Sequence, residues 1–188
     1  MRLFVAVNLP EEERRAAHEA VAPLRDAGLP VKWVAEASLH VTLRFLGEVA
    51  EERAVAIGAA LDAAVASARP FEVGLGGTGA FPALARPHVI WLGVEPHPAL
   101  ELLANDVERA LRPFGFEAEL RPFQPHITLG RVRRGAKPGA FAALGRLVGA
   151  VAWEGVAPVD SVDLMASVLG PGGATYAVRH RSFLEGGR

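Results

Sequence analysis

Two short segments of this chain share one pattern of alternating apolar and polar residues. In HVTLRFLG, His40 and Thr42 stand two residues apart within an apolar run, and in PHITLGRV, His126 and Thr128 repeat that relation 86 residues later. A strand directs residues two apart to the same face, so each segment predicts a strand that presents an imidazole and a hydroxyl together. The doubling favours a fold in which two similar strands occupy equivalent positions.

Chance does not readily account for the doubling. Six histidines and four threonines in 188 residues give an expectation of roughly 0.13 His-x-Thr occurrences, and two are present. One such pair would be read more simply as a satisfied core histidine beside a strand-forming threonine. Two pairs in equivalent places argue against that reading, because a buried polar group without a function is readily replaced by an apolar one.

The segments around the two motifs follow the same order. Strands are predicted at 2–9, 37–47 and from 71 in the first half, and at 88–94, 125–132 and 159–169 in the second. Helices are predicted at 11–27 and 48–68, and then at 97–115 and within 138–149. A turn at 170–174 and a last strand at 175–184 complete the chain.

This order predicts the α+β class. We expect one bilobal domain over residues 1–188, with an internal repeat at approximately 2–82 and 88–169 and the last strand at 175–184. Each of the two pseudo-symmetric lobes would be an antiparallel sheet with helices on its outer face, and the catalytic cleft would lie between the lobes.

Composition narrows the possible functions. The formal net charge of −1 provides no global basic field, so local geometry must hold any anion. The absence of cysteine excludes disulfides, a thiolate nucleophile and a cysteine-based zinc site. The apolar start, MRLFVAVNLP, is too short for a signal sequence, and no segment has the length of a membrane span. We expect a cytoplasmic monomer with no membrane association and no required protein partner.

Two imidazoles and two hydroxyls suit displacement at phosphorus. Imidazole titrates near neutral pH, so one histidine can remove a proton from water while the other protonates the departing oxygen. Threonine hydroxyls and a guanidinium can hold the non-bridging oxygens. We expect no metal and no cofactor, because the motifs lack the carboxylates that a magnesium site requires.

LHVTLRFLGEV and FQPHITLGRV, with VKWV before the first motif and VIWLGV between the two, resemble the 2H phosphoesterase superfamily. Within it, they are most similar to the RNA 2′,3′-cyclic phosphodiesterases, formerly named 2′–5′ RNA ligases. The resemblance covers essentially the whole chain. It implies an enzyme that hydrolyses a terminal ribose 2′,3′-cyclic phosphate to the 2′-phosphate without a metal, acting on RNA 3′ ends or small cyclic nucleotides.

The resemblance also implies roles for individual residues. His40 would be the general acid that expels O3′, and His126 the general base toward water. Exchanged roles would give the 3′-phosphate, or the same 2′-phosphate from a substrate bound in the flipped orientation. Thr42 and Thr128 would bind phosphate oxygens. The family uses an arginine beyond the second motif, which corresponds here to Arg131.

The sequence pattern suggests two further candidates, Arg44 and Phe81, and it also bears on Arg131. Strict alternation from His126 sends Arg131 to the opposite face unless the strand ends or bulges there. Arg44 lies an even number of residues from His40, so alternation places both on the same face and makes Arg44 a candidate phosphate ligand. The alternative interpretation of Arg44 is a surface charge at a strand edge. Phe81, after a glycine-rich run, is a candidate for stacking on a substrate base, its alternative being a core position.

Other functions remain open from the sequence. The same histidines would serve a 2′–5′ RNA ligase or a phosphodiesterase that acts on another cyclic or 2′–5′ linked nucleotide. A non-catalytic module that binds RNA ends would keep the pocket without turnover. A bis-histidine metal site ranks last, because neither motif supplies a third ligand.

Overall fold

The computed structural model describes residues 1–170 and 173–186. The strands are β1 (Arg2–Asn8), β2 (Val31–Trp33), β3 (His40–Glu48), β4 (Phe71–Ala83), β5 (Arg86–Val94), β6 (His126–Val132), β7 (Glu154–Val159), β8 (Ser161–Gly170) and β9 (Gly173–Phe183). The helices are α1 (Glu11–Ala20), α2 (Ala22–Arg25), α3 (Glu51–Val65), α4 (Pro98–Leu111) and α5 (Leu144–Gly149), with 3-10 turns at Glu36–Ser38, Arg112–Phe114 and Pro138–Phe141. Residues 171–172 of the predicted turn at 170–174 lie outside the described residues.

The predicted helix at 11–27 is interrupted. It forms α1 and α2, which are separated at Val21. Pro23 explains the break, because a proline has no N–H with which to continue the α-helical hydrogen bonds of α1. Two strands, β2 and β7, were not predicted from the sequence.

The strands form one antiparallel path with the order β7-β4-β5-β6-β3-β1-β8-β9, and β2 pairs with β6. At its centre, β3 and β6 are joined through the single pair Val41 and Ile127. We call β3, β1, β8 and β9 the first lobe, and β6, β5, β4 and β7 the second lobe. Antiparallel sheets of this kind confirm the predicted α+β class.

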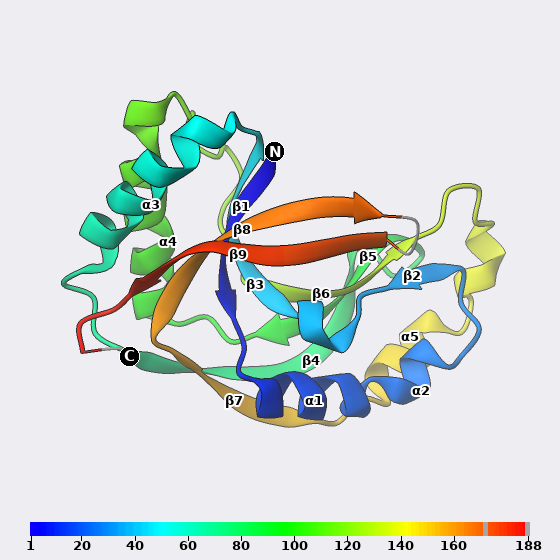
Figure 1. Ribbon diagram of the computed structural model, residues 1–188. Coiled ribbons are helices and arrows are strands. Elements are labelled where there is room, and N and C mark those ends of the chain that lie inside the picture. Colours follow the sequence, from blue (N-terminus) through cyan, green and yellow to red (C-terminus); the bar gives the residue numbers. More distant parts are fainter. Residues whose placement is uncertain (171–172, 187–188) are drawn as a thin grey trace.

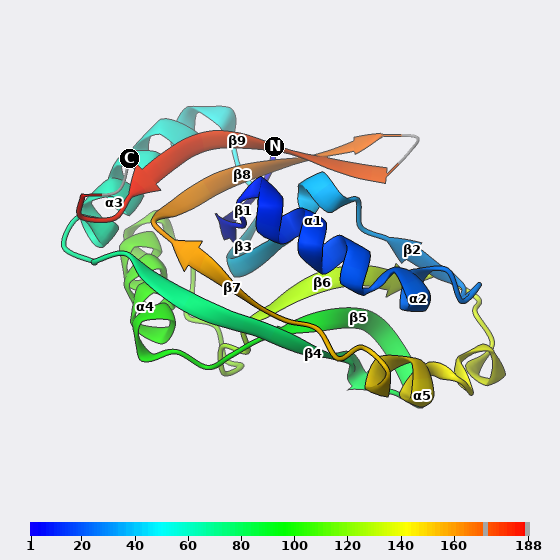
Figure 2. The same ribbon diagram turned by 90° about the horizontal axis from the view of Figure 1, so that it is seen from below.

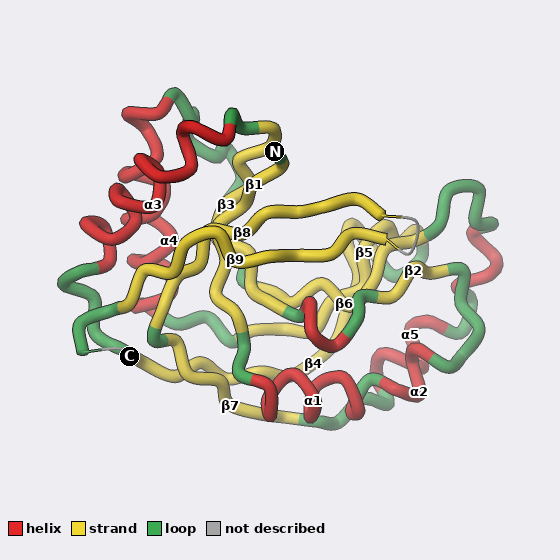
Figure 3. Tube along the Cα trace, viewed as in Figure 1, coloured by secondary structure: helices red, strands yellow, loops and turns green. Residues whose placement is uncertain are grey.

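Helices cover the outer side of each lobe. In the first lobe, α3 contacts β8 and β9 while α4 contacts β3; in the second, α1 contacts β7 and α5 contacts β4. Figure 1 shows α3 and α4 together at one end of the molecule and α1, α2 and α5 at the other, and Figure 2 shows the same grouping from below. The strands fill the space between these two helical groups (Figure 3). None of the described helices is both long and apolar enough to cross a membrane.

The two halves of the chain are intertwined. Strand β4 belongs to the first half of the sequence but lies in the second lobe, and β8 makes the reverse exchange. The helices do the same, because α1 packs on the second lobe and α4 on the first. Each lobe is therefore built from both halves of the sequence.

Strand β1 shows how each sheet separates its two faces. Leu3, Val5 and Val7 are buried in the large core on the helical side. Phe4 and Ala6 alternate with them and belong to a second, smaller cluster on the other face, against which Tyr176 packs. This second face carries the two His-x-Thr motifs.

Candidate active site

The single pair that joins the lobes also brings the two motifs together. Val41 pairs with Ile127 in antiparallel register. The flanking residues on the two strands therefore oppose each other, His40 toward Thr128 and Thr42 toward His126. Each imidazole lies beside the threonine of the other motif, and all four side chains share one face of the sheet.

The backbone fixes both rings in the same tautomer. Nδ1 of His40 lies 2.8 Å from the carbonyl oxygen of Ser38, and Nδ1 of His126 lies 2.7 Å from that of Gln124. A carbonyl oxygen only accepts, so Nδ1 carries the hydrogen in both rings. Nε2 is then the atom left for proton exchange, and that of His40 lies 3.1 Å from Oγ1 of Thr42.

Aromatic side chains pack against both imidazoles. The ring of Phe4 lies 4.9 Å from that of His40 and the ring of Tyr176 lies 5.3 Å from it, the latter edge-on. The ring of Phe81 lies 5.1 Å from that of His126, also edge-on. Sequence reasoning missed Tyr176, because it lies in the last strand, outside the predicted repeat, and only the fold brings it to His40.

A bulge decides the position of Arg131. On β6, Thr128 opposes Trp91 and Arg131 opposes Val89, with Leu129 as an extra residue between them. Trp91 and Val89 are two residues apart and share a face, so Arg131 returns to the face of Thr128. The bulge resolves the parity problem that strict alternation posed for this arginine.

A second bulge, on β3, has the opposite effect on Arg44. Thr42 opposes Ala6 while Arg44 opposes Val5, so the two residues of β3 face opposite sides of the sheet. The guanidinium of Arg44 instead donates to the carboxylate of Glu119 at 2.8 Å and to the carbonyl of Glu117. The structure thus engages Arg44 with the segment between α4 and β6.

Phe45 takes the face that simple alternation gave to Arg44. It opposes Phe4, which lies two residues before Ala6 and shares the face of the motifs. Phe45 stands 86 residues before Arg131, the same separation as that of the two histidines. The pseudo-symmetry therefore places a phenylalanine in one lobe where the other lobe has an arginine.

The backbone at the β6 bulge depends on Gly130. A Cβ at this position would lie 2.5 Å from Cγ1 of Val31 and 2.9 Å from the indole of Trp33, both on β2. We expect Gly130→Ala to lower the free energy of unfolding by about 1–3 kcal/mol, because β2 must shift to admit the methyl group. Chemical denaturation measures this loss. Gly139→Ala is the control, since no atom lies within 4 Å of its added Cβ; an equal loss in both variants would contradict the explanation.

A cavity of about 670 Å³ opens beside the motifs. His40, Thr42, Thr128 and Arg131 line it, together with residues of β1, β2, β8 and β9. His126 and Phe81 lie next to each other on β6 and β4 and do not line this cavity, and neither does Arg44. We call it the cleft cavity, because both lobes contribute to its wall, as the predicted fold requires.

Burial and charge both act on His40. Burial lowers its pKa below the ordinary value of 6.5; the hydrogen bond to the Ser38 carbonyl opposes this, and the positive charges of Arg131 and His126 lower the pKa further. The ring is therefore mostly neutral at pH 7 in the ligand-free protein. The register of β3 and β6, which places His126 diagonally across from His40, accounts for the influence of His126.

The charge of Arg131 provides a direct test of this electrostatic coupling. Arg131→Gln removes a cation that disfavours protonated His40, so we expect the pKa of His40 to rise. Titration of the His40 ring signals by NMR measures the shift. Arg134→Gln is the matched control, because Arg134 is not among the groups that act on the pKa of His40. An unchanged His40 pKa in Arg131→Gln would show that the guanidinium does not act on the ring.

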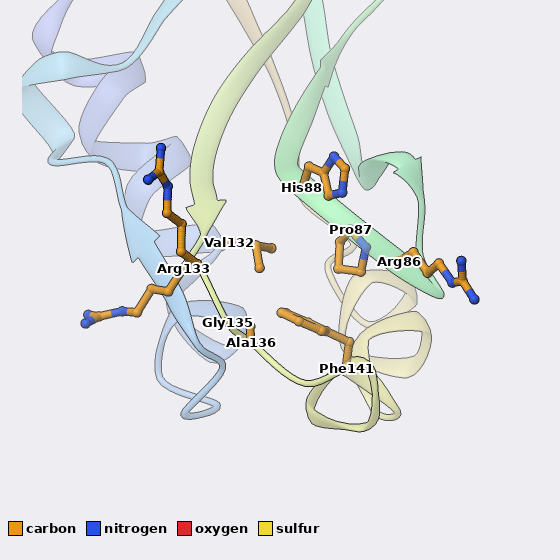
Figure 4. A pocket seen from close by; sticks show the side chains of 9 residues that line it. Arg86, Pro87, His88, Val132, Arg133, Gly135, Ala136 and Phe141 are labelled. Atoms are coloured by element: carbon orange, nitrogen blue, oxygen red, sulfur yellow. The ribbon is translucent and has the colours of Figure 1, made fainter.

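A second hollow, of about 470 Å³, lies where β5 begins and β6 ends. Pro87, Val132 and Phe141 form its apolar part, and Figure 4 shows the side chains of Arg86 and Arg133 extending away from it. It contains neither motif. Among the described residues, no cluster of three or more histidine and carboxylate side chains has a geometry that could hold a metal ion.

Known proteins are similar to this chain in sequence. Residues 10–167 match the family model of the 2′-5′ RNA ligase superfamily. The chain is 39% identical to an RNA 2′,3′-cyclic phosphodiesterase of Aeropyrum pernix, over 83% of this chain and 90% of that protein. It is 34% identical to an RNA 2′,3′-cyclic phosphodiesterase of Thermotoga maritima, over 100% of this chain and 97% of that protein.

A solved structure shows the same fold. The crystal structure of E. coli LigT complexed with 3′-AMP superposes with a TM-score of 0.73 at 29% sequence identity, covering 97% of each chain. The family model, the two relatives and this structure all span the region that contains both motifs. The chain therefore belongs to the 2′-5′ RNA ligase superfamily, the 2H phosphoesterases that its sequence pattern resembles.

Proposed function

We propose that this enzyme hydrolyses the 2′,3′-cyclic phosphate at the end of an RNA to a 2′-phosphate, by acid–base catalysis without a metal. The observation that carries the proposal is the register of β3 and β6, which sets two imidazoles of fixed tautomer on one face, each beside the threonine of the other motif. The names of the relatives from Aeropyrum pernix and Thermotoga maritima support the same substrate.

The proposed reaction uses the two Nε2 atoms in sequence. Nε2 of His126 removes a proton from water as the water oxygen attacks phosphorus. The bond between phosphorus and O3′ breaks, and His40 donates the proton on its Nε2 to O3′. Thr42, Thr128 and Arg131 hold the non-bridging oxygens and stabilise the charge that develops on them.

The pKa of His40 bears on this assignment. A general acid must be protonated, whereas burial keeps His40 mostly neutral in the free protein. The negatively charged cyclic phosphate, bound beside the ring, favours the protonated form and raises the pKa of His40 in the complex. Exchanged roles, with His40 as base, would leave a 3′-phosphate on the RNA end, or the same 2′-phosphate from a substrate bound in the flipped orientation.

Product analysis tests the function. A short RNA with a 2′,3′-cyclic end is incubated with the enzyme in EDTA, and the product is compared with authentic 2′- and 3′-phosphate ends. We expect hydrolysis to the 2′-phosphate; a 3′-phosphate product would reverse the two roles, and inhibition by EDTA would overturn the metal-free mechanism. A parallel reaction on a 2′–5′ linked dinucleotide ranks the alternative activity, and binding of the cyclic end without hydrolysis would identify a binding module.

A further inference from the structure

The cleft cavity extends well beyond the four motif residues. It continues along β2 and the beginning of β1, where Lys32 and Arg2 join Arg131 in lining it. Lys32 opposes Arg131 in the pairing of β2 with β6, so the two side chains lie on the same face. None of the described residues that line the cavity is acidic, so its charged wall is entirely cationic. Glu48 of β3 lies opposite Arg2 of β1. Its carboxylate forms an ion pair with the N-terminal amine at 3.3 Å.

The same wall carries unusually accessible aromatic rings. Phe45 is 63% exposed although it stands in the middle of the sheet, and Trp33 on β2 is only half-buried. The ring of Phe45 lies 6.1 Å from that of Phe4, but most of its surface faces solvent, so burial in the core does not explain this apolar side chain. Trp33 lines the cavity and also packs against the large core.

Cations along a groove and aromatic rings between them are the two features with which proteins bind single-stranded nucleic acid. The cations follow the backbone phosphates, and the rings stack on bases without strong sequence preference. The two lobes differ at one equivalent position, where the first lobe has Phe45 and the second has Arg131. This difference favours one orientation of a bound ligand. A phosphate held at Arg131 therefore has Phe45 at the equivalent position of the first lobe.

We propose that the cleft cavity binds the nucleotide that precedes the cyclic-phosphate terminus, with its phosphate at Lys32 and Arg2 and its base on Phe45. The preferred substrate is then an oligoribonucleotide end and not a cyclic mononucleotide. This inference rests on the proposed function, because the reacting phosphate supplies the reference point from which the preceding nucleotide is placed. The cavity volume of about 670 Å³ lies within the usual range for pockets that bind small molecules, and a nucleotide is of that size.

The test compares two substrates in one enzyme. We expect kcat/KM for a trinucleotide with a 2′,3′-cyclic end to exceed that for the matching cyclic mononucleotide by about 5- to 100-fold, the effect of stacking one base. Phe45→Ala and Lys32→Gln should each reduce this ratio toward one. Lys137→Gln is the matched control, because Lys137 is the chain's other lysine and does not line the cavity; its ratio should equal that of the wild type.

Salt dependence separates the phosphate contact from a general loss of structure. For the trinucleotide, log kcat/KM should decrease with the logarithm of the salt concentration. In Lys32→Gln this dependence should be less steep by about 0.7, the value for one phosphate contact with a single strand. Equal kcat/KM for both substrates in the wild type would overturn the inference and leave the proposed function intact.

If the protein does not hydrolyse cyclic phosphates, the proposed function fails, but RNA binding by the cleft cavity can still be measured. Fluorescence anisotropy with a labelled single-stranded tetranucleotide then tests the groove by itself. Weaker binding by Lys32→Gln and Phe45→Ala than by Lys137→Gln supports the groove as an RNA site, and equal binding by all three variants rejects it.

Discussion

Replacing either motif histidine by alanine is expected to lower the turnover of a 2′,3′-cyclic RNA end by about 10²–10⁴-fold, the usual contribution of a general acid or base. Nε2 of each ring is the atom left for proton exchange, because Nδ1 donates to a backbone carbonyl. Alanine removes this atom and leaves the sheet pairing unchanged. Single-turnover rates with a cyclic-ended oligonucleotide measure the effect on the chemical step.

His88→Ala is the control for these variants, since His88 lies on β5 at the second hollow, away from the motifs. It should turn over at the wild-type rate. Circular dichroism and thermal unfolding show whether His40→Ala stays folded, which matters because Phe4 and Tyr176 pack against its ring. A folded His40→Ala or His126→Ala variant that loses less than threefold in rate would remove that residue from the mechanism.

Replacing Arg131 by alanine is expected to lower turnover by about 10²–10³-fold, the usual loss when one group that stabilises a developing oxyanion is removed. The bulge at Leu129 returns Arg131 to the face of the two motifs, where its guanidinium lines the cleft cavity. The loss should appear in kcat as well as in kcat/KM, because the charge on the phosphate oxygens increases toward the transition state. Steady-state kinetics over a range of substrate concentrations separates the two.

Arg131→Lys and Arg134→Ala complete this experiment. Lysine keeps the charge but not the two-pronged geometry, so it should restore only part of the rate. Arg134 belongs to the second hollow and its loss should not change turnover. Full activity in Arg131→Ala would mean that the threonines alone hold the phosphate, and the phosphate-binding role of Arg131 would have to be abandoned.

The sequence was most informative where local periodicity decides the outcome. His40 with Thr42, and His126 with Thr128, share a face because residues two apart on a strand must do so. The offset between the motifs also indicated two equivalent strands, and the structure joins them at Val41 through the one pair that connects the lobes. These inferences needed only the geometry of an extended chain.

The sequence by itself did not decide where the two arginines face. Alternation favoured Arg44 for the cleft and sent Arg131 away, and the bulges on β3 and β6 reversed both. A bulge is defined by how a strand pairs with its neighbour, β1 in one case and β5 in the other, and these neighbours are distant in sequence. The register of those pairings is a property of the tertiary structure.

The sequence by itself therefore determined the side chains of the candidate site: two imidazoles, two hydroxyls, and strands that present each pair on one face. Tertiary structure decided the rest. It exchanged β4 and β8 between the lobes, brought Tyr176 to His40, and placed Phe45 where the other lobe has Arg131. The physical reason is that the face of a side chain within a strand depends on neighbouring residues, whereas its partners across the sheet depend on contacts between segments far apart in the chain.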